Sequence, residues 1–306
     1  GTTARHYQHN YLSGYGEVLM EEDWNFATVS SVLSDSSDIA ESNRDETKLL
    51  SYFGRIQYDL DEKYMLNLTV RSDGSSKLAE GNRFRYFPSA SVGWVVSNEN
   101  FWPASAVNFL KFRGSWGRNG SIGSLGNFEY VSLMNTSAES SYYLSGGRQL
   151  TGSEPYQLAN PDLVWETSEQ VDVGIDIHLF QSQLTFSADY YEKTTIDLIT
   201  TGAVPLYVGN DQPKVNAGDI TNSGFELELG LKKRIGDFSY DIKAVAASLH
   251  NEVTYIGNQA SVLQGANLGT TGAITRSEES KPIWFIYGYS ADGIFANQAE
   301  IDAYTN

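Results

Sequence analysis

The sequence predicts an all-β fold, an antiparallel transmembrane β-barrel, of which this chain supplies a partial set of about 8–9 long strands. Three observations predict it. Apolar and polar residues alternate over long runs, the runs have about 9–14 residues, and their connections alternate between short and long. Ordinary strands have about 5–6 residues, whereas about 9–11 tilted residues are needed to cross a bilayer.

The segment from Gln170 to Lys193 shows the alternation most clearly. Apolar residues take every second position of its first half: Val171, Val173, Ile175, Ile177 and Leu179. The positions between them, Asp172 and Asp176 included, are mostly polar. No water in a bilayer core can pair with backbone groups, so a closed sheet must pair them. We therefore interpret the apolar column as facing lipid and the polar column as facing a wet lumen.

The alternation predicts strands along most of the chain, taken here in order. They lie near residues 50–60, 64–72, 84–96, 109–118, 168–180, 184–193, 224–233 and 238–251, with a ninth candidate near 282–290. Residues 1–49 contain the Ser- and Asp-rich stretch SDSSDIAESNRDE and are predicted as a polar, loop-rich segment. The barrel segment is then residues 50–306.

The predicted connections fall into two classes. Short ones lie at residues 61–63, after Val96, at 181–183 and near Gly236. Long ones lie near residues 118–162, 194–221 and 252–281. Outer-membrane barrels have short periplasmic turns and longer outer loops, so the long segments are predicted as outer loops.

The composition excludes several classes of function. A net charge of -17 argues against nucleic-acid binding, which needs clustered Lys and Arg. The absence of cysteine excludes disulfides and Cys-based metal or redox sites from this chain. The sequence contains no apolar run long enough for a transmembrane helix, and its first residues do not form a signal peptide. It also lacks an initiator Met, so we expect a processed or excised piece.

The chain is rich in tyrosine and tryptophan, with 19 and 6 residues, respectively. Several lie at apolar positions near strand ends, where barrels carry girdles of aromatic residues at the membrane boundaries. The predicted girdle residues are Tyr52, Tyr58, Tyr64, Tyr86, Trp94, Trp116 and Tyr190.

A series of segments resembles the SusC/RagA family of TonB-dependent outer-membrane transporters. The series begins with LLSYFGRIQYDLDEKYMLNLTVRSDG at Leu49 and runs through LKFRGSWGRNGS, LVWETSEQVDVGIDIHLFQSQLTFSADYYEKTTIDLI, NAGDITNSGFELEL and PIWFIYGYSADGIF. The segments cover most of Leu49 to Phe295 in the family's order and spacing. One departure lies in a loop, where the chain has Arg118-Asn119-Gly120 instead of Thr-Gly-Asn.

The resemblance implies a barrel of twenty-two strands with an N-terminal plug, in the outer membrane of a Gram-negative bacterium. It implies energy from the TonB complex and a lid formed by a SusD-like lipoprotein. The implied cargo is an oligosaccharide or an oligopeptide. The TonB box, plug domain, early strands and closing strand are absent from this sequence, so it corresponds to a middle-to-late barrel segment.

The sequence gives no sign of catalysis, of a cofactor or of a metal site. Glu226 and Glu228 share one face of a predicted strand, and we interpret them as a hydrated lumen wall rather than an acid–base pair. His6 and His9 lack the further ligands of a zinc motif.

The predicted cargo-binding residues lie in the outer loops, which mix flat aromatic rings with amides and carboxylates. They are Tyr142, Tyr143, Arg148, Asn160, Asp162, Trp165, Tyr207, Asn210 and Asp211. The competing interpretation is that these side chains hold the loops together or contact the lid.

Two other fold hypotheses remain open at the level of the sequence. A soluble β-sandwich, acting as a carbohydrate-binding or adhesin module, would bury the apolar column against a second sheet. A small barrel would instead close within this chain.

Overall fold

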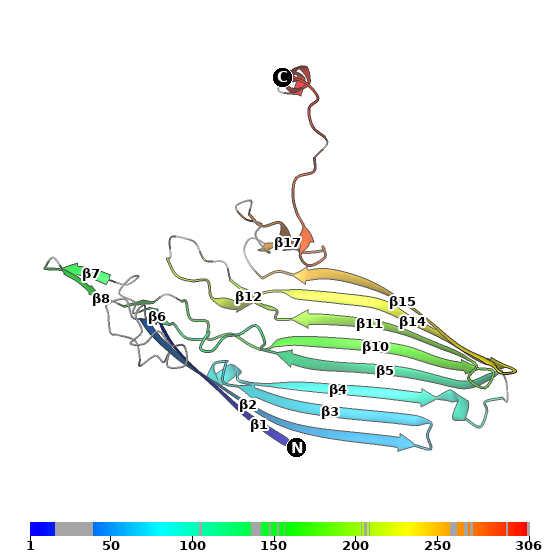
Figure 1. The fold of residues 1–306 in the computed structure, drawn as a ribbon. Coiled ribbons are helices and arrows are strands. Elements are labelled where there is room, and N and C mark those ends of the chain that lie inside the picture. Colours follow the sequence, from blue (N-terminus) through cyan, green and yellow to red (C-terminus); the bar gives the residue numbers. More distant parts are fainter. Residues whose placement is uncertain are drawn as a thin grey trace, which may run out of the picture.

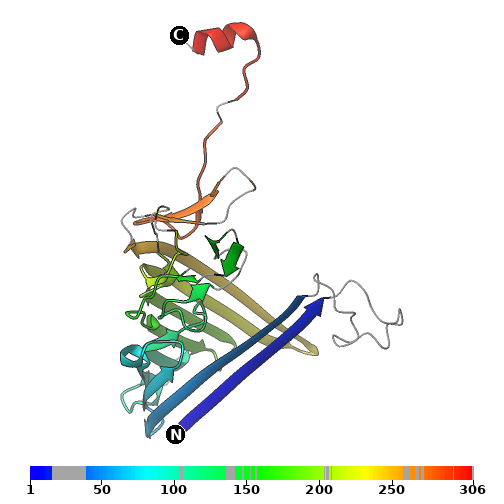
Figure 2. The same ribbon diagram turned by 90° about the vertical axis from the view of Figure 1, so that its left-hand side faces the viewer.

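The computed structural model describes residues 1–15, 39–103, 106–135, 142–146, 148–151, 153–155, 157–202, 204, 207, 209–257, 262–265, 269, 272–291 and 293–304. Their main feature is one curved, nine-stranded antiparallel sheet, shown in Figures 1 and 2. The order of its strands is β1-β2-β3-β4-β5-β10-β11-β14-β15. Every neighbouring pair in it is antiparallel.

The strands of this sheet are long. They are β1 (Thr2–Tyr15), β2 (Ile39–Leu60), β3 (Tyr64–Ser75), β4 (Phe84–Val95), β5 (Val107–Ser121), β10 (Glu166–Leu179), β11 (Leu184–Ile196), β14 (Asp219–Ile235) and β15 (Phe238–Tyr255). Even the shortest, β3 and β4, have 12 residues each, or about 40 Å at ~3.3 Å per residue.

The remaining described elements are short and lie in the connections between these strands or after β15. The strands are β6 (Met134–Asn135), β7 (Tyr142–Ser145), β8 (Arg148–Thr151), β9 (Glu154–Pro155), β12 (Ile199–Thr201), β13 (Lys214–Asn216), β16 (Val262–Gln264), β17 (Thr275–Glu278) and β18 (Phe285–Ile286). The helical elements are the 3₁₀ turns η3 (Glu80–Asn82) and η4 (Val96–Asn98) and the helix α1 (Gln298–Tyr304). Within the described ranges, no helix has the length and hydropathy to cross a membrane.

Eight strands of the sheet lie where the alternation predicts them, and the structure differs from the prediction at both ends of the chain. Residues 1–49 are not only loop, because β1 occupies Thr2–Tyr15 and β2 begins at Ile39. The pattern missed β1 because polar residues such as His6 and His9 fall on both of its faces. The ninth candidate, near 282–290, holds only β18, which belongs to a small sheet with β16 and β17.

Tight turns connect neighbouring strands at one end of the sheet. Gly236 has a φ of 59° at the first central position of the two-residue turn between β14 and β15, a conformation that suits glycine. Asp61 and Glu62 take φ values of 54° and 55° between β2 and β3. The opposite end of the sheet carries the longer connections, including residues 122–165 between β5 and β10 (Figure 1).

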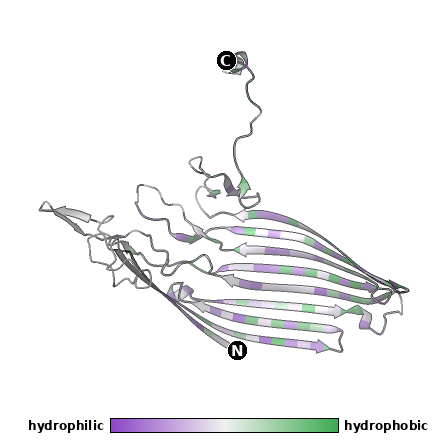
Figure 3. Cartoon of the chain, in the orientation of Figure 1, coloured by the Kyte–Doolittle hydropathy of each residue, from purple (hydrophilic) through white to green (hydrophobic). Residues whose placement is uncertain are grey.

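The strand register places apolar side chains side by side across the sheet. Tyr64 pairs with Trp94, which pairs in turn with Phe112, while Ala90 and Val171 flank Trp116 from the two neighbouring strands. Figure 3 shows the resulting alternation of hydrophobic and hydrophilic positions along strands such as β10 and β11. Many large side chains of this apolar column, such as Tyr64, Val92 and Val173, are exposed.

The predicted girdle residues fall into two groups along the apolar column. Tyr58, Tyr64 and Trp94 lie near the short turns, whereas Tyr52, Tyr86, Trp116 and Tyr190 lie toward the long connections. Trp94 and Tyr86 are eight positions apart on β4, which corresponds to about 26 Å along the strand. For a strand tilted by about 40°, this spacing corresponds to a height of about 20 Å, somewhat less than the ~25 Å of the apolar band on outer-membrane barrels.

Both hydrophobic cores lie at the long-loop end, on the side of the sheet opposite the apolar column. One, called the loop core below, contains Leu78, Phe87, Leu125, Leu163, Trp165 and Ile199. The other contains Ile220, Val253, Ile256 and Leu263. In the described part of the chain no second sheet covers the apolar column, as a β-sandwich would require.

The exposed surface is also too large for a compact soluble domain. It measures 21323 Å², whereas a compact monomer of 33.8 kDa exposes about 12,700 Å². The order of the sheet starts at β1 and ends at β15, so within the described residues the two edge strands do not pair with each other. The sheet is a partial barrel rather than a small closed one.

Candidate functional site: the polar wall

The polar face of the central strands carries a row of charged side chains in register. Arg113 on β5 lies opposite Gly174 on β10, which lies opposite Asp189 on β11, which lies opposite Glu226 on β14. These four positions therefore form one line across four strands of the wall.

Gly174 allows the two charged neighbours to meet across an intervening strand. A Cβ atom at this position would lie 2.2 Å from Asp189 Oδ1 and 3.0 Å from Arg113 Cζ. Because glycine leaves that space empty, the Arg113 guanidinium crosses β10 and reaches the carboxylate of Asp189 at 3.0 Å. The ion pair thus joins β5 to β11, which are not neighbours in the sheet.

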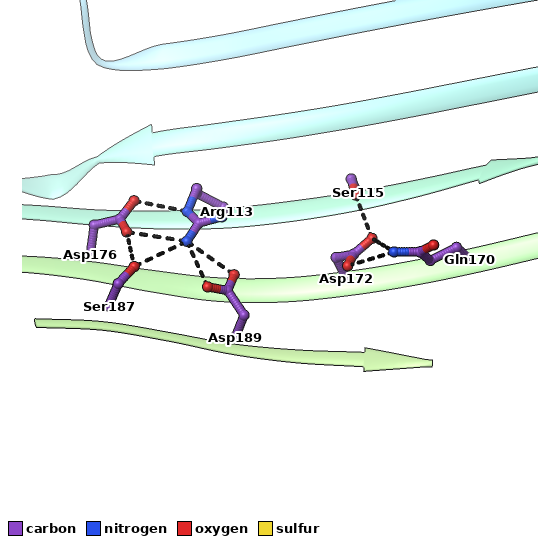
Figure 4. Close-up of polar contacts among 7 residues, drawn as sticks. All are labelled: Arg113, Ser115, Gln170, Asp172, Asp176, Ser187 and Asp189. Atoms are coloured by element: carbon purple, nitrogen blue, oxygen red, sulfur yellow. Dashed lines mark hydrogen bonds and ion pairs between the residues drawn. The ribbon is translucent and has the colours of Figure 1, made fainter. Parts of the chain in front are cut away.

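Arg113 is the centre of a network of hydrogen bonds, drawn in Figure 4. Its Nε donates to Asp176 Oδ2 at 2.8 Å and its Nη2 donates to Asp176 Oδ1 at 3.1 Å, the forked geometry that suits a carboxylate. The same Nη2 donates to Asp189 and to Ser187 Oγ. One arginine therefore holds two carboxylates and a hydroxyl from two strands.

A second polar group lies further along β10. Ser115 Oγ donates to Asp172 Oδ2 at 3.1 Å, and Gln170 Nε2 donates to the same carboxylate at 3.0 and 3.1 Å (Figure 4). Ser115 and Asp172, together with Arg113 and Lys111, line a hollow of about 310 Å³ on this face of the sheet.

The chemistry of the wall is that of fixed charges. Its carboxylates are held by arginine, lysine, hydroxyl and amide donors, as Glu228 is by Lys243 at 2.7 Å. Such groups can bind polar solutes by hydrogen bonds. His6 and His9 point to opposite faces of β1, so they cannot share a metal ion. Over the described ranges, no three His, Asp or Glu residues converge as metal ligands.

The structure brings together two of the predicted cargo-binding segments. Asn160 Nδ2 donates to the backbone oxygen of Lys214 at 2.7 Å, and Asn210 Nδ2 donates to that of Pro155 at 2.6 Å. Asp211 forms a backbone bridge with Gln157. The amides of Asn160 and Asn210 therefore tie the loop before β10 to the loop before β13.

The other predicted residues divide by exposure. Asp162 is exposed, and Tyr207 is 89% exposed, so both side chains are free to meet a solute. Tyr142, Tyr143 and Arg148 belong to the hairpin β7–β8, and their side chains lie outside what the structure describes.

Trp165 differs from its expected exposed position. Only 5% of the residue is exposed, because its ring packs edge-on against Phe87 with centroids 5.6 Å apart. The indole nitrogen donates to the backbone oxygen of Arg83 at 2.9 Å. The ring thus holds the loops on the wall, and the small exposed part of the residue lines a hollow at the long-loop end.

The sequence signalled only part of this site. Alternation placed Asp172, Asp176 and Asp189 on the polar face, but it did not single out Arg113. The missing information is the register, which alone aligns Gly174 with Arg113 and Asp189.

A family comparison fits this architecture of long antiparallel strands with one apolar and one charged face. The family model described as "TonB dependent receptor-like, beta-barrel" matches residues 2–305. This chain belongs to that family. Its polar wall is accordingly the inner wall of a TonB-dependent receptor barrel, and its apolar column is the outer face of that barrel.

Relatives of the chain carry related names. TonB-dependent receptor P3 of Formosa agariphila is 36% identical over 185 residues, covering 60% of this chain and 18% of the relative. TonB-dependent receptor SusC of Bacteroides thetaiotaomicron is 30% identical over 259 residues, covering 83% of this chain and 25% of the relative. The chain thus spans no more than about a quarter of either relative.

The fold has a counterpart among solved structures. The RagAB peptide importer in its "closed-closed" state superposes with a TM-score of 0.77, at 22% identity, over 92% of this chain and 30% of that chain. At this identity the likeness concerns the fold.

Proposed function

We propose that this chain is a middle-to-late barrel segment of an outer-membrane importer that is powered through TonB. Its cargo is an oligosaccharide or an oligopeptide, and a SusD-like lipoprotein forms its outer lid. The chain performs no covalent chemistry. The importer sits in the outer membrane of a Gram-negative bacterium, with the aromatic rows of the apolar column at the two membrane boundaries.

The observation that supports the proposal is the division of one sheet of long strands into an apolar outer face and a charged inner face. A lumen lined by fixed hydrogen-bonding groups can solvate a polar cargo along its path. The same wall can hold the plug, the part of such a barrel that would move when TonB pulls. Neither role needs an acid–base pair.

The loop residues Asp162 and Tyr207 are proposed as cargo contacts, because both side chains are exposed. Asn160 and Asn210 would act beside them by holding the two loops together. Asp211, Tyr142, Tyr143 and Arg148 complete the proposed set.

Two similarities support the two classes of cargo. The family relationship to SusC agrees with the resemblance on which an oligosaccharide is proposed. The RagAB structure is described as that of a peptide importer, which supports the peptide alternative through the fold alone.

The test is an uptake assay on the bacterium that carries the full-length receptor. We expect deletion of its gene to abolish uptake of at least one labelled oligosaccharide or oligopeptide. The full-length gene should restore uptake, whereas a version that cannot engage TonB should not. Wild-type uptake of every labelled probe by the deletion strain would overturn the proposal. Co-purification from detergent extracts then tests whether a lipoprotein accompanies the receptor.

A further inference from the structure

A second hollow lies on the inner face at the long-loop end, where β1, β2 and β3 meet the end of β5. Its volume is about 480 Å³. Its polar and charged lining residues include Arg5, Ser51, Arg71, Asp73, Asn119 and Ser121. It is separate from the hollow around Arg113, with which it shares no lining residue.

The charge of this hollow is opposite to that of the rest of the chain. Two arginines and one aspartate line it, which leaves a net charge of +1. The hollow around Arg113 contains two basic and three acidic side chains, a net charge of -1, and the whole chain carries -17. A positive hollow in an acidic chain therefore marks a place where an anion is locally favoured.

One of the two arginines, Arg71, forms hydrogen bonds with neighbouring residues of the chain. Arg71 Nε donates to both oxygens of Asp73, at 2.6 and 2.7 Å, and its Nη2 donates to Ser51 Oγ at 2.9 Å. Its guanidinium also lies over the ring of Phe53, 5.9 Å from the centroid. Arg71 and Asp73 neutralise each other and stiffen one side of the hollow.

The other arginine, Arg5, has no such partner among the described residues. Arg5 is exposed, and no ion pair or side-chain hydrogen bond joins it to any residue in the described ranges. An unpaired guanidinium has five N–H donors in a planar fork that matches the two oxygens of a carboxylate. Arg5 is therefore the group that gives the hollow its free positive charge.

Neutral hydrogen-bonding groups and a fixed floor surround Arg5. The hydroxyl of Ser121 and the amide of Asn119 line the hollow from β5. The floor is held by the loop core, because Gly120 passes so close to Phe87 that a Cβ would lie 2.1 Å from the ring. The hollow thus combines one free cation with uncharged donors and acceptors on a rigid frame.

We propose that this hollow binds the carboxylate of an anionic cargo, with Arg5 as the recognising group. The inference rests on the proposed importer function and specifies its cargo chemistry. A uronic-acid oligosaccharide and an acidic oligopeptide share that chemistry, and separate arms of the experiment distinguish them.

The experiment measures binding of fluorescent probes to the purified full-length receptor. The saccharide arm uses an oligogalacturonate and its methyl ester, and the peptide arm uses an acidic tetrapeptide and its side-chain amide. We expect the charged probe of one arm to bind about tenfold more tightly than its neutral partner, since a charge-assisted hydrogen bond is worth at least that factor.

The decisive variant is Arg5→Gln, with Arg5→Lys and Arg55→Gln beside it. Arg5→Gln should remove the preference for the charged probe and leave the neutral probe unaffected, while Arg5→Lys should keep part of the preference. Arg55 also faces the lumen, from β2, but it lies outside the hollow and donates to Asn67, so Arg55→Gln should bind like the wild type. Heat-modifiable gel migration shows whether each variant is folded.

The outcomes separate the two proposals. If neutral probes bind but charge adds nothing, or if folded Arg5→Gln keeps the preference, the carboxylate hollow is wrong while the importer stands. If no saccharide or peptide probe binds in either arm, the carboxylate hollow is wrong, and the uptake assay on the deletion strain decides separately whether the importer function stands.

Discussion

Arg113 shows how one residue can join strands that are not adjacent. It donates to Asp176 on the neighbouring strand and, over Gly174, to Asp189 on the strand beyond. The Arg113 side chain is 38% exposed, so water screens part of each interaction. The network therefore acts mainly by fixing the positions of lumen charges, with a moderate gain in stability.

We predict that Arg113→Gln lowers the free energy of unfolding by about 1–2 kcal/mol, because two carboxylates lose their shared donor. Arg113→Lys should recover only part of the loss, since an ammonium cannot bind in a forked geometry. Urea titration of the folded receptor in detergent measures both. Arg55→Gln, which removes a single hydrogen bond to Asn67, is the matched control. A loss as large in the control would contradict a special role for Arg113.

Glu99 is the corresponding residue at the short-turn end, in the connection after η4. It accepts hydrogen bonds from Tyr64 Oη, from Trp94 Nε1 at 3.1 Å and from Lys63 Nζ at 3.2 Å. These donors, Tyr64 first among them, hold the pKa of Glu99 below the ordinary glutamate value. The carboxylate thereby ties the connection to the start of β3 and the end of β4.

The sign of the pKa shift fixes how stability depends on pH. A lowered folded-state pKa stabilises the fold above the unfolded value of about 4.3, and the gain disappears as pH falls through the folded-state pKa. We therefore expect Glu99→Gln to lower the melting temperature at pH 7 and to match the wild type increasingly well below about pH 4. Glu62→Gln, in the neighbouring turn, is the control. A melting-temperature difference that is constant from pH 7 to pH 3 would refute this linkage.

At the scale of elements, the loop core is the part that determines where the outer connections sit. Phe87 projects from the inner face of β4, and Leu125, Leu163 and Trp165 reach it from the connection between β5 and β10. This packing folds the connection back onto the wall. It explains why Trp165 stabilises the loops, although its sequence context suggested a cargo contact.

We predict that Trp165→Ala opens this connection while the strands stay paired. Truncating a buried aromatic costs about 3–5 kcal/mol, which exceeds what a surface loop can absorb without local unfolding. Hydrogen exchange should speed up at least about tenfold for the backbone amides of Leu125 and Val131, which donate within this loop. Val131→Ala changes a residue that is 37% exposed and should leave the exchange unchanged. Faster exchange throughout β10 would instead mean that the whole sheet depends on Trp165.

The sequence predicted the strands that have one apolar face and one hydrated face. Strands such as β10 and β11 alternate cleanly because one column is apolar and the other is hydrated. The pattern could not predict β1, whose residues are polar on both faces, nor assign the faces of β15. There Val245 and Leu249 lie on the same face as Glu228, although both are apolar. These strands form by backbone hydrogen bonds to their neighbours, and the residue pattern of a single strand does not reveal such pairing.

The site was less predictable than the strands, for a physical reason. The polar column follows from alternation, but the Arg113 network and the Arg5 hollow depend on residues from three or more strands. Their meeting is set by register and by the absence of a side chain at Gly174. Loop residues such as Asn160 and Asn210 could be selected by type, yet only the folded loops show that their amides bind backbone oxygens.

At the scale of the whole molecule, the sheet makes sense only as part of a larger barrel. Its nine strands leave an apolar column uncovered and two long edges unpaired among the described residues. In water such edges invite aggregation, whereas in a bilayer the neighbouring strands of a closed barrel pair them. The lipid-facing assignment of the apolar column is thus the central claim, on which the importer proposal depends.

Nitroxide-lipid quenching tests that claim most directly. Single cysteines are placed in β10 of the full-length receptor, at Val173 or Ile175 on the apolar column and at Gln170 or Asp172 on the polar wall, and each carries a small fluorophore in a bilayer. We predict strong quenching at Val173 and Ile175 and little at Gln170 and Asp172, with a period of two along the strand. Equal quenching at both sets, or stronger quenching at Gln170 and Asp172, would contradict the account.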